Sequence, residues 1–132
     1  MENRTDAYTV LCVDDEDGQL KVRKLLLESQ GYRVLTATSG AEGISLFRSD
    51  HIDAVVLDYW MAGMTGVAVA RELKKTSPNT PIIILSAYVQ LPDEALGVAD
   101  IWILKGEDPQ YLLSKLKQLL AARATKQSAN IQ

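Results

Sequence analysis

The chain has 132 residues, of which 47% are hydrophobic and 23% charged, and its formal net charge is −3. This composition is that of one globular domain large enough to bury a core, and the slightly acidic balance argues against direct nucleic-acid binding by this domain. No apolar stretch is long enough to span a bilayer and the polar N-terminus does not resemble a signal peptide, so no membrane contact is expected. Cys12, the single cysteine, lies in an apolar run, which favours a buried thiol in a reducing cytoplasm.

Short apolar runs alternate with helical patterns along the whole chain. The runs predicted as strands are residues 8–13, 32–37, 52–57, 82–85 and 100–104. The segments predicted as helices are residues 17–30, 40–49, 67–75, a short piece at 92–96, and 109 onward. A run that is apolar at every position, such as residues 54–57, indicates a strand buried on both faces. The alternation therefore predicts an α/β three-layer sandwich, with a five-stranded parallel sheet and helices on both faces.

The first helix is expected to bury one apolar face and to end at Gly31. The residues assigned to that face are Leu20, Val22, Leu25 and either Leu26 or Leu27. Arg23 falls outside this set and is expected on another side of the helix.

Capping residues predict where the other helices begin. Ser39 and Glu42 match a capping box, and Asp108 precedes Pro109 as the cap of the last helix. Arg123 is expected on the solvated face of that helix. Residues 1–125 are predicted to form a single domain, with 126–132 as a disordered tail or the remnant of a linker.

Polar residues follow four of the predicted strands. Asp14 and Asp15 follow the first strand, Asp58 the third, Ser86 the fourth and Lys105 the fifth. Because parallel strands end at the same rim of a sheet, these side chains are expected to meet. Three clustered carboxylates favour a hard divalent cation such as Mg²⁺, while a hydroxyl and an amine can bind phosphoryl oxygens. A carboxylate can also act as the nucleophile and form an aspartyl phosphate.

With the loop Met-Ala-Gly-Met-Thr-Gly at residues 61–66, this set resembles the receiver domain of two-component response regulators, over about residues 8–122. The resemblance implies a flavodoxin-like fold with strand order 2-1-3-4-5. It implies that Asp58 is the phosphoacceptor and that Asp15, Asp58 and the backbone carbonyl of Trp60 bind Mg²⁺, with Asp14 acting through water. It further implies that Ser86 and Lys105 assist the reaction and that a histidine kinase or a small phosphodonor supplies the phosphoryl group.

The sequence departs from the family pattern at three places. Ala62 stands where a proline is usual, which predicts a more mobile loop after Asp58. Gly106 also replaces a usual proline, which predicts a trans bond before residue 106 and could change the direction in which Lys105 points. The interval between Ser86 and residue 102 is short, which predicts a shortened fourth helix.

Aromatic residues are expected around the site. Trp102 stands at the position of the family's switch aromatic, and the alternative is an indole lodged permanently against the sheet edge. Trp60 and Tyr88 are hypothesised to shield the phosphoryl group from water, the alternative being that both face solvent or a partner. Met61 and Ala87 are the other residues predicted to flank the site.

The predicted function is a phosphorylation-dependent signalling switch that is not an ordinary enzyme. Its expected partners are a histidine kinase and an unknown downstream protein or a missing output domain, with a homodimer also open. One alternative is a degenerate receiver that serves only as a docking module, which would gain if Gly106 misdirects Lys105. The other is a Mg²⁺–aspartate phosphatase, which is disfavoured because such an enzyme would want a general acid where Trp60 stands.

Overall fold

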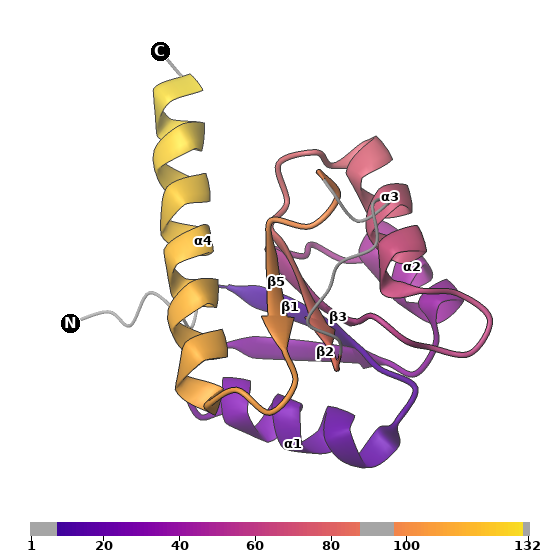
Figure 1. Ribbon diagram of the computed structural model, residues 1–132. Coiled ribbons are helices and arrows are strands. Elements are labelled where there is room, and N and C mark those ends of the chain that lie inside the picture. Colours follow the sequence, from indigo (N-terminus) through magenta and orange to yellow (C-terminus); the bar gives the residue numbers. More distant parts are fainter. Residues whose placement is uncertain (1–7, 88–96, 131–132) are drawn as a thin grey trace.

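The computed structural model describes residues 8–87 and 97–130, with side chains up to residue 125. Five strands form one parallel sheet in the order β2-β1-β3-β4-β5 (Figure 1). The strands are β1 (Thr9–Val13), β2 (Arg33–Ala37), β3 (Ala54–Asp58), β4 (Ile82–Ser86) and β5 (Ile101–Leu104). The predicted number, direction and order of the strands are therefore confirmed.

The described helices cover both faces of this sheet. They are α1 (Asp17–Glu28), α2 (Gly40–Ser49), α3 (Gly66–Thr76) and α4 (Pro109–Asn130). Figure 1 shows α1 and α4 on one side of the sheet and α2 and α3 on the other, which agrees with the two core clusters. The short helix predicted at 92–96, and with it the shortened fourth helix, lies outside the described residues. Helix α4 continues to Asn130, so residues 126–130 are helical where a disordered tail was expected.

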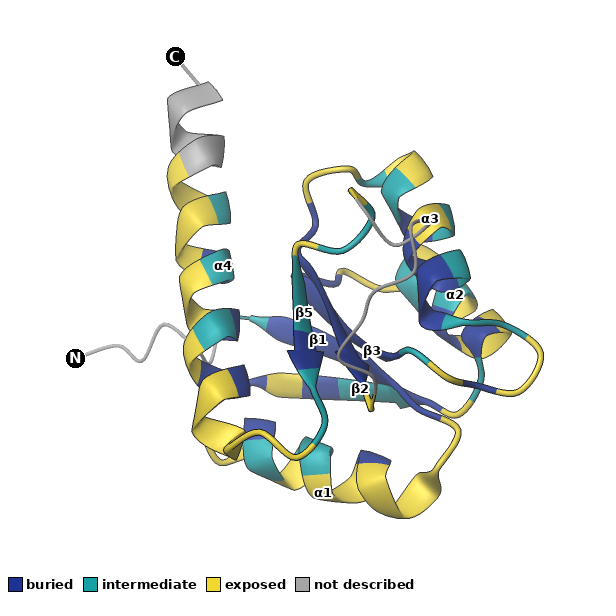
Figure 2. Ribbon diagram, in the orientation of Figure 1, coloured by how far each residue is buried: buried dark blue, intermediate teal, exposed yellow. Residues whose placement is uncertain are grey.

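The central strands are buried because their side chains alternate between two cores, as the dark strands in Figure 2 show. In β3, Val56 packs with α1 and α4 while Val55 and Leu57 pack with α2 and α3. In β4, Ile83 and Ile84 divide in the same way. This alternation explains why the strands are apolar at every position and confirms the three-layer arrangement. Among the described residues, no helix combines the length and apolar character needed to cross a membrane.

The predicted buried face of α1 was wrong in part. Leu20 and Leu27 are buried, but Val22 and Leu25 are each 68% exposed. Residues at i and i+7 lie on the same side of a helix, whereas i+2 and i+5 point away from it. The periodicity alone did not show which of the clustered leucines faces the sheet.

The helix caps agree with the sequence except in one detail. Ser39 Oγ accepts a hydrogen bond from the backbone N–H of Glu42 at 3.1 Å, as a capping box requires. The Glu42 carboxylate, however, accepts from the N–H of Thr38 at 2.8 Å, one residue before the cap. Asp108 Oδ1 accepts from the N–H of Gln110 at 2.9 Å at the start of α4, which confirms the predicted cap.

The prediction that Arg123 lies on the solvated face of the last helix is wrong. Its side chain instead connects α4 to the residue that precedes β3. Its Nη1 donates to the backbone oxygen of Asp53 at 3.0 Å and lies 3.4 Å from Asp53 Oδ1. The other carboxylate oxygen of Asp53 accepts from the N–H of Thr9 at 2.8 Å. His51, 79% exposed at its side chain, contacts the same carboxylate at 2.9 Å. This network ties together β1, β3 and α4 at the edge opposite the strand carboxyl ends.

Candidate functional site

The carboxyl ends of the strands gather most of the predicted site residues around one cavity. Strand register places Asp58 of β3 opposite Leu85, and Ser86 of β4 opposite Leu104, so the ends are level. The cavity has a volume of about 330 Å³ and is lined by Asp15, Glu16, Asp58, Tyr59, Trp60, Ser86, Ala87 and Lys105. Tyr88 lies outside the described residues. Met61 is 5% exposed and packs in the core of the α2–α3 side instead of lining the cavity.

Three carboxylates come together at this cavity, and they fit a divalent metal ion. Ligand oxygens of Asp14, Asp15 and Asp58 all lie within 4.8 Å of one another. Asp14 and Asp58 are buried while Asp15 is exposed. Because three carboxylates at this separation repel one another, an oxygen-preferring cation such as Mg²⁺ would stabilise them.

Local hydrogen bonds hold the first two acids. Asp14 Oδ1 accepts from the N–H of Glu16 at 2.9 Å, and its Oδ2 lies 3.2 Å from Arg23 Nη1. Asp15 Oδ2 accepts from the N–H of Ala62 at 2.9 Å, which joins the loop after β1 to the loop after β3. The residue in the position of the usual proline therefore contributes a backbone donor to the acidic cluster, which a proline lacks.

The same loop folds back tightly on the end of β3. Gly66 donates its N–H to the backbone oxygen of Tyr59 at 2.8 Å. A Cβ at Gly66 would lie 2.5 Å from the backbone oxygen of Asp58, which is closer than real Cβ atoms approach. Only glycine fits here, so the second glycine of the loop is a packing requirement of the site.

Asp58 and Lys105 form an ion pair across the cavity, with Nζ and Oδ1 2.5 Å apart. The Asp58 side chain is 5% exposed and that of Lys105 is 29% exposed. Burial raises the pKa of the Asp58 carboxyl above its ordinary value; the hydrogen bond from Lys105 acts in the opposite direction, and the charge of Asp14 adds to the rise. Burial therefore disfavours the charged form of the Asp58 carboxyl, and nearby cations such as Lys105 stabilise that form.

Gly106 does not divert Lys105 from the site. Among the described residues every peptide bond is trans, as was predicted for this position, and Gly106 has φ of +95°. That left-handed conformation suits glycine and turns the chain directly after the lysine. The N–H of Lys105 donates to the backbone oxygen of Ser86 at 2.7 Å, so β4 holds the lysine backbone.

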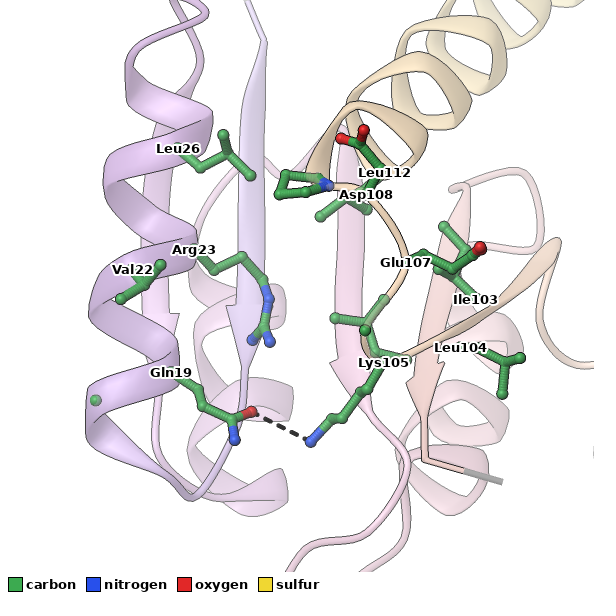
Figure 3. Close-up of a pocket in the computed structure, with 14 residues that line it drawn as sticks. Gln19, Val22, Arg23, Leu26, Ile103, Leu104, Lys105, Glu107, Asp108 and Leu112 are labelled. Carbon is green, nitrogen blue, oxygen red and sulfur yellow. Dashed lines mark hydrogen bonds between the residues drawn. The ribbon is translucent and has the colours of Figure 1, made fainter. Parts of the chain in front are cut away.

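Two residues of α1 reach the site although the sequence did not indicate them. Gln19 Oε1 accepts from Lys105 Nζ at 3.3 Å (Figure 3). Arg23 pairs with Asp14. Gln19 and Arg23 are four residues apart and therefore share one side of the helix. The signal available in the sequence was this i, i+4 pair of polar residues in the helix that follows the acidic doublet.

Aromatic rings surround the rim. The rings of Tyr59 and Trp102 lie 5.4 Å apart between centroids, and those of Tyr59 and Trp60 lie 6.1 Å apart. Trp102 is half-buried against the α2–α3 core, and its buried Nε1 has no hydrogen-bond partner among the described residues. Trp60 is 68% exposed. Whether Trp102 moves, and whether Trp60 shields the site, stay predictions.

A second, more apolar groove adjoins the site between α1 and the start of α4 (Figure 3). Its volume is about 470 Å³, and Val22, Leu26, Ile103 and Leu112 contribute its apolar walls. Arg23 and Lys105 also line it, and each of them pairs with an acid of the cluster.

The family model of the response regulator receiver domain matches residues 10–121 of this chain. The chain belongs to that family. As a receiver domain it is a signalling phosphoacceptor domain of two-component systems and not an enzyme in the ordinary sense, and the predicted resemblance is confirmed.

Similar proteins agree with this assignment. The receiver domain is 43% identical over 84 residues to the transcriptional regulatory protein GlrR of Escherichia coli, which covers 64% of this chain and 19% of that protein. It is 32% identical over 120 residues to the uncharacterized transcriptional regulatory protein YkoG of Bacillus subtilis, covering 89% of this chain and 53% of that protein. The chain thus spans about half the length, or less, of these relatives.

Among solved structures, the response regulator TrrA of Thermotoga maritima, in complex with Mg²⁺-BeF, matches with a TM-score of 0.80 and 34% identity. That match covers 85% of this receiver domain and 98% of TrrA. A relative of the same fold therefore binds Mg²⁺, and the acidic cluster of this receiver domain is suited to the same ion.

Proposed function

We propose that this receiver domain is switched by phosphorylation of Asp58, and that Asp14, Asp15 and the backbone carbonyl of Trp60 complete a Mg²⁺ site beside it. The observation that carries the proposal is the pairing of buried Asp58 with Lys105 at a distance of 2.5 Å, within the only cluster of acids that the described residues bring together. A buried carboxylate with a cation on one side and two acids on the other suits phosphoryl transfer, which depends mainly on positioning and charge stabilisation.

The chemistry is a displacement at phosphorus. A carboxylate oxygen of Asp58 attacks the phosphorus of the donor, the bond from phosphorus to the donor's nitrogen or oxygen breaks, and the leaving group keeps the bonding electrons. Lys105 holds a positive charge at the place where phosphoryl oxygens arrive, and Ser86, at the end of β4, supplies a hydroxyl donor. Bound Mg²⁺ would neutralise charge on the incoming phosphoryl group.

The proposed output is a change of surface. The new phosphoryl charge draws Ser86 and Lys105 inward, and this shift favours one of two existing arrangements of the domain. Trp102, packed on Tyr59 beside this region, is the aromatic residue proposed to move with Ser86. We propose a histidine kinase as phosphodonor and a downstream protein or an attached output domain as the responder; homodimer formation stays a prediction.

Acetyl phosphate with Mg²⁺, followed by intact mass measurement, tests the proposal. The expected result is one phosphoryl adduct that is absent from Asp58→Ala and present in the control Asp50→Asn, which alters an exposed acid at the end of α2. Phosphate release without an adduct would favour the phosphatase alternative. No reaction, from acetyl phosphate or from a kinase, would favour the docking module.

A further inference from the structure

Arg23 is a largely shielded cation that lies beside the acidic cluster. It extends from α1 toward the rim beside Gln19 (Figure 3). Its Nη1 lies 3.2 Å from Asp14 Oδ2, and the two side chains are 11% and 0% exposed. An ion pair so shielded from water interacts far more strongly than the exposed pairs of the same helix, such as Lys21 with Asp17.

This contact leaves Asp14 engaged at both oxygens. Oδ1 accepts the N–H of Glu16 at 2.9 Å while Oδ2 faces the guanidinium. A metal ion that bound Asp14 directly would therefore have to share a carboxylate oxygen with one of these partners. The arrangement fits the expected role of Asp14 as a ligand that acts through water.

The charges of the cluster are already balanced in large part. Asp14, Asp15 and Asp58 contribute three negative charges, while Arg23 and Lys105 contribute two positive charges, which leaves a net charge of −1. Without Arg23 these groups would carry −2, and Glu16, which also lines the cavity, adds a further negative charge.

We infer that Arg23 is a resident counter-cation that sets the Mg²⁺ affinity of this receiver domain below the affinity its three carboxylates would have alone. The inference rests on the proposed Mg²⁺ site. Arg23 stabilises the cluster when no metal is bound, and its charge opposes the entry of a second cation. Arg23 is a positioning and charge-setting residue, because it acts through Asp14.

The test is a Mg²⁺ titration followed by isothermal calorimetry and by tryptophan fluorescence, to which Trp60 at the cavity and Trp102 both contribute. Arg23→Met keeps the aliphatic stem along the groove and removes the charge, and it should tighten Mg²⁺ binding by about three- to thirtyfold, the scale of one partly screened charge at short range. Arg23→Lys retains the charge and should bind Mg²⁺ within about twofold of the unaltered domain. Lys24→Met removes a charge from the same helix, where Lys24 pairs with Glu28, and should leave the affinity unchanged.

Thermal unfolding supplies an independent readout. Without metal, Arg23→Met should unfold at a lower temperature, because Asp14 loses its partner; saturating Mg²⁺ should restore more stability to it than to the unaltered domain. If Arg23→Met is unfolded without metal, Mg²⁺ should fold it, because binding of the ion to the folded state stabilises that state. This result would support the inference.

The outcomes separate the two proposals. Equal or weaker Mg²⁺ binding by Arg23→Met, with normal binding by the unaltered domain, would overturn the role of Arg23 and leave the proposed function standing. Failure of the unaltered domain to bind Mg²⁺ at millimolar concentration would overturn the proposed metal site and the role of Arg23 together.

Discussion

Lys105 Nζ lies 2.5 Å from Asp58 Oδ1, so the amine after β5 and the carboxylate at the end of β3 are paired before any phosphoryl group arrives. This pairing bears on the glycine at position 106, which could have turned the lysine away. It places the cation where the developing charge of a transferred phosphoryl group would need it, and it disfavours the docking alternative.

Replacement of this lysine should therefore impair the chemistry more than the fold. Lys105→Met is expected to slow phosphorylation by acetyl phosphate by roughly a hundredfold, the usual cost of losing one preorganised charge-stabilising group. The rate is measured from intact mass over time. Lys21→Met, at a lysine whose side chain is 74% exposed, is the matched control and should react at the normal rate. An equal rate in both variants would show that Lys105 has no part in the transfer.

The raised pKa of Asp58 predicts a stability that depends on pH. The folded state holds the Asp58 proton to higher pH than the unfolded state does. Protonation of Asp58 therefore stabilises the fold fully below the ordinary pKa of the group. This stabilisation is lost as pH rises through the raised pKa. At neutral pH, without metal, Asp58→Asn should therefore be more stable by about 1 kcal/mol, or ~3–5 °C in Tm.

Calorimetric melting across the acidic range checks this expectation. The advantage of Asp58→Asn should shrink as pH falls toward the ordinary pKa of an aspartate, and it should shrink at neutral pH when Mg²⁺ is added. If the stability difference between Asp58→Asn and the unaltered domain stays constant with both pH and Mg²⁺, the raised pKa of Asp58 is contradicted.

Gly66 is expected to be irreplaceable for a steric reason. Gly66→Ala would bring a Cβ to within 2.5 Å of the Asp58 backbone oxygen and should destabilise the fold by about 1–3 kcal/mol. Gly18→Ala, in the first turn of α1 with no atom within 4 Å of the new Cβ, should instead stabilise by up to ~1 kcal/mol. Urea unfolding of both variants measures the difference, and effects of the same sign would refute the steric explanation.

The contact between Arg123 and Asp53 should contribute to global stability without affecting the site. Their side chains are 16% and 9% exposed, and Arg123→Met would remove a hydrogen bond to a backbone carbonyl as well as the ion pair. The expected loss is about 1.5–3 kcal/mol of unfolding free energy, with acetyl phosphate reactivity retained. Lys117→Met, on the exposed face of the same helix, should change stability by less than ~0.5 kcal/mol.

Trp60 lines the cavity while most of its surface meets solvent. If the ring restricts water at the phosphoryl group, Trp60→Asn should speed the loss of the adduct by about three- to tenfold. The decay is followed by mass after the phosphodonor is removed. An unchanged decay would mean that the indole serves as a surface for partners and not as a shield.

The architecture and the residues of the site could be predicted from the amino-acid sequence. The apolar runs alternating with helical patterns predicted the parallel sheet, because strands buried on both faces leave no polar positions. The acids, hydroxyl and amine at four strand ends had to converge, because parallel strands end at one rim. Local chemistry also fixed the caps at Ser39 and Asp108, where each side chain acts within a few residues of itself.

Which side of α1 is buried depended on how the helix packs against the rest of the fold. Val22 and Leu25 look as apolar as Leu20 and Leu27, but the docking of α1 on the sheet exposes the first pair. The same docking turns Arg23 toward Asp14. Such contacts join residues of different elements. The periodicity of a helix shows which of its residues share a side, but not which residues of the sheet that side will meet.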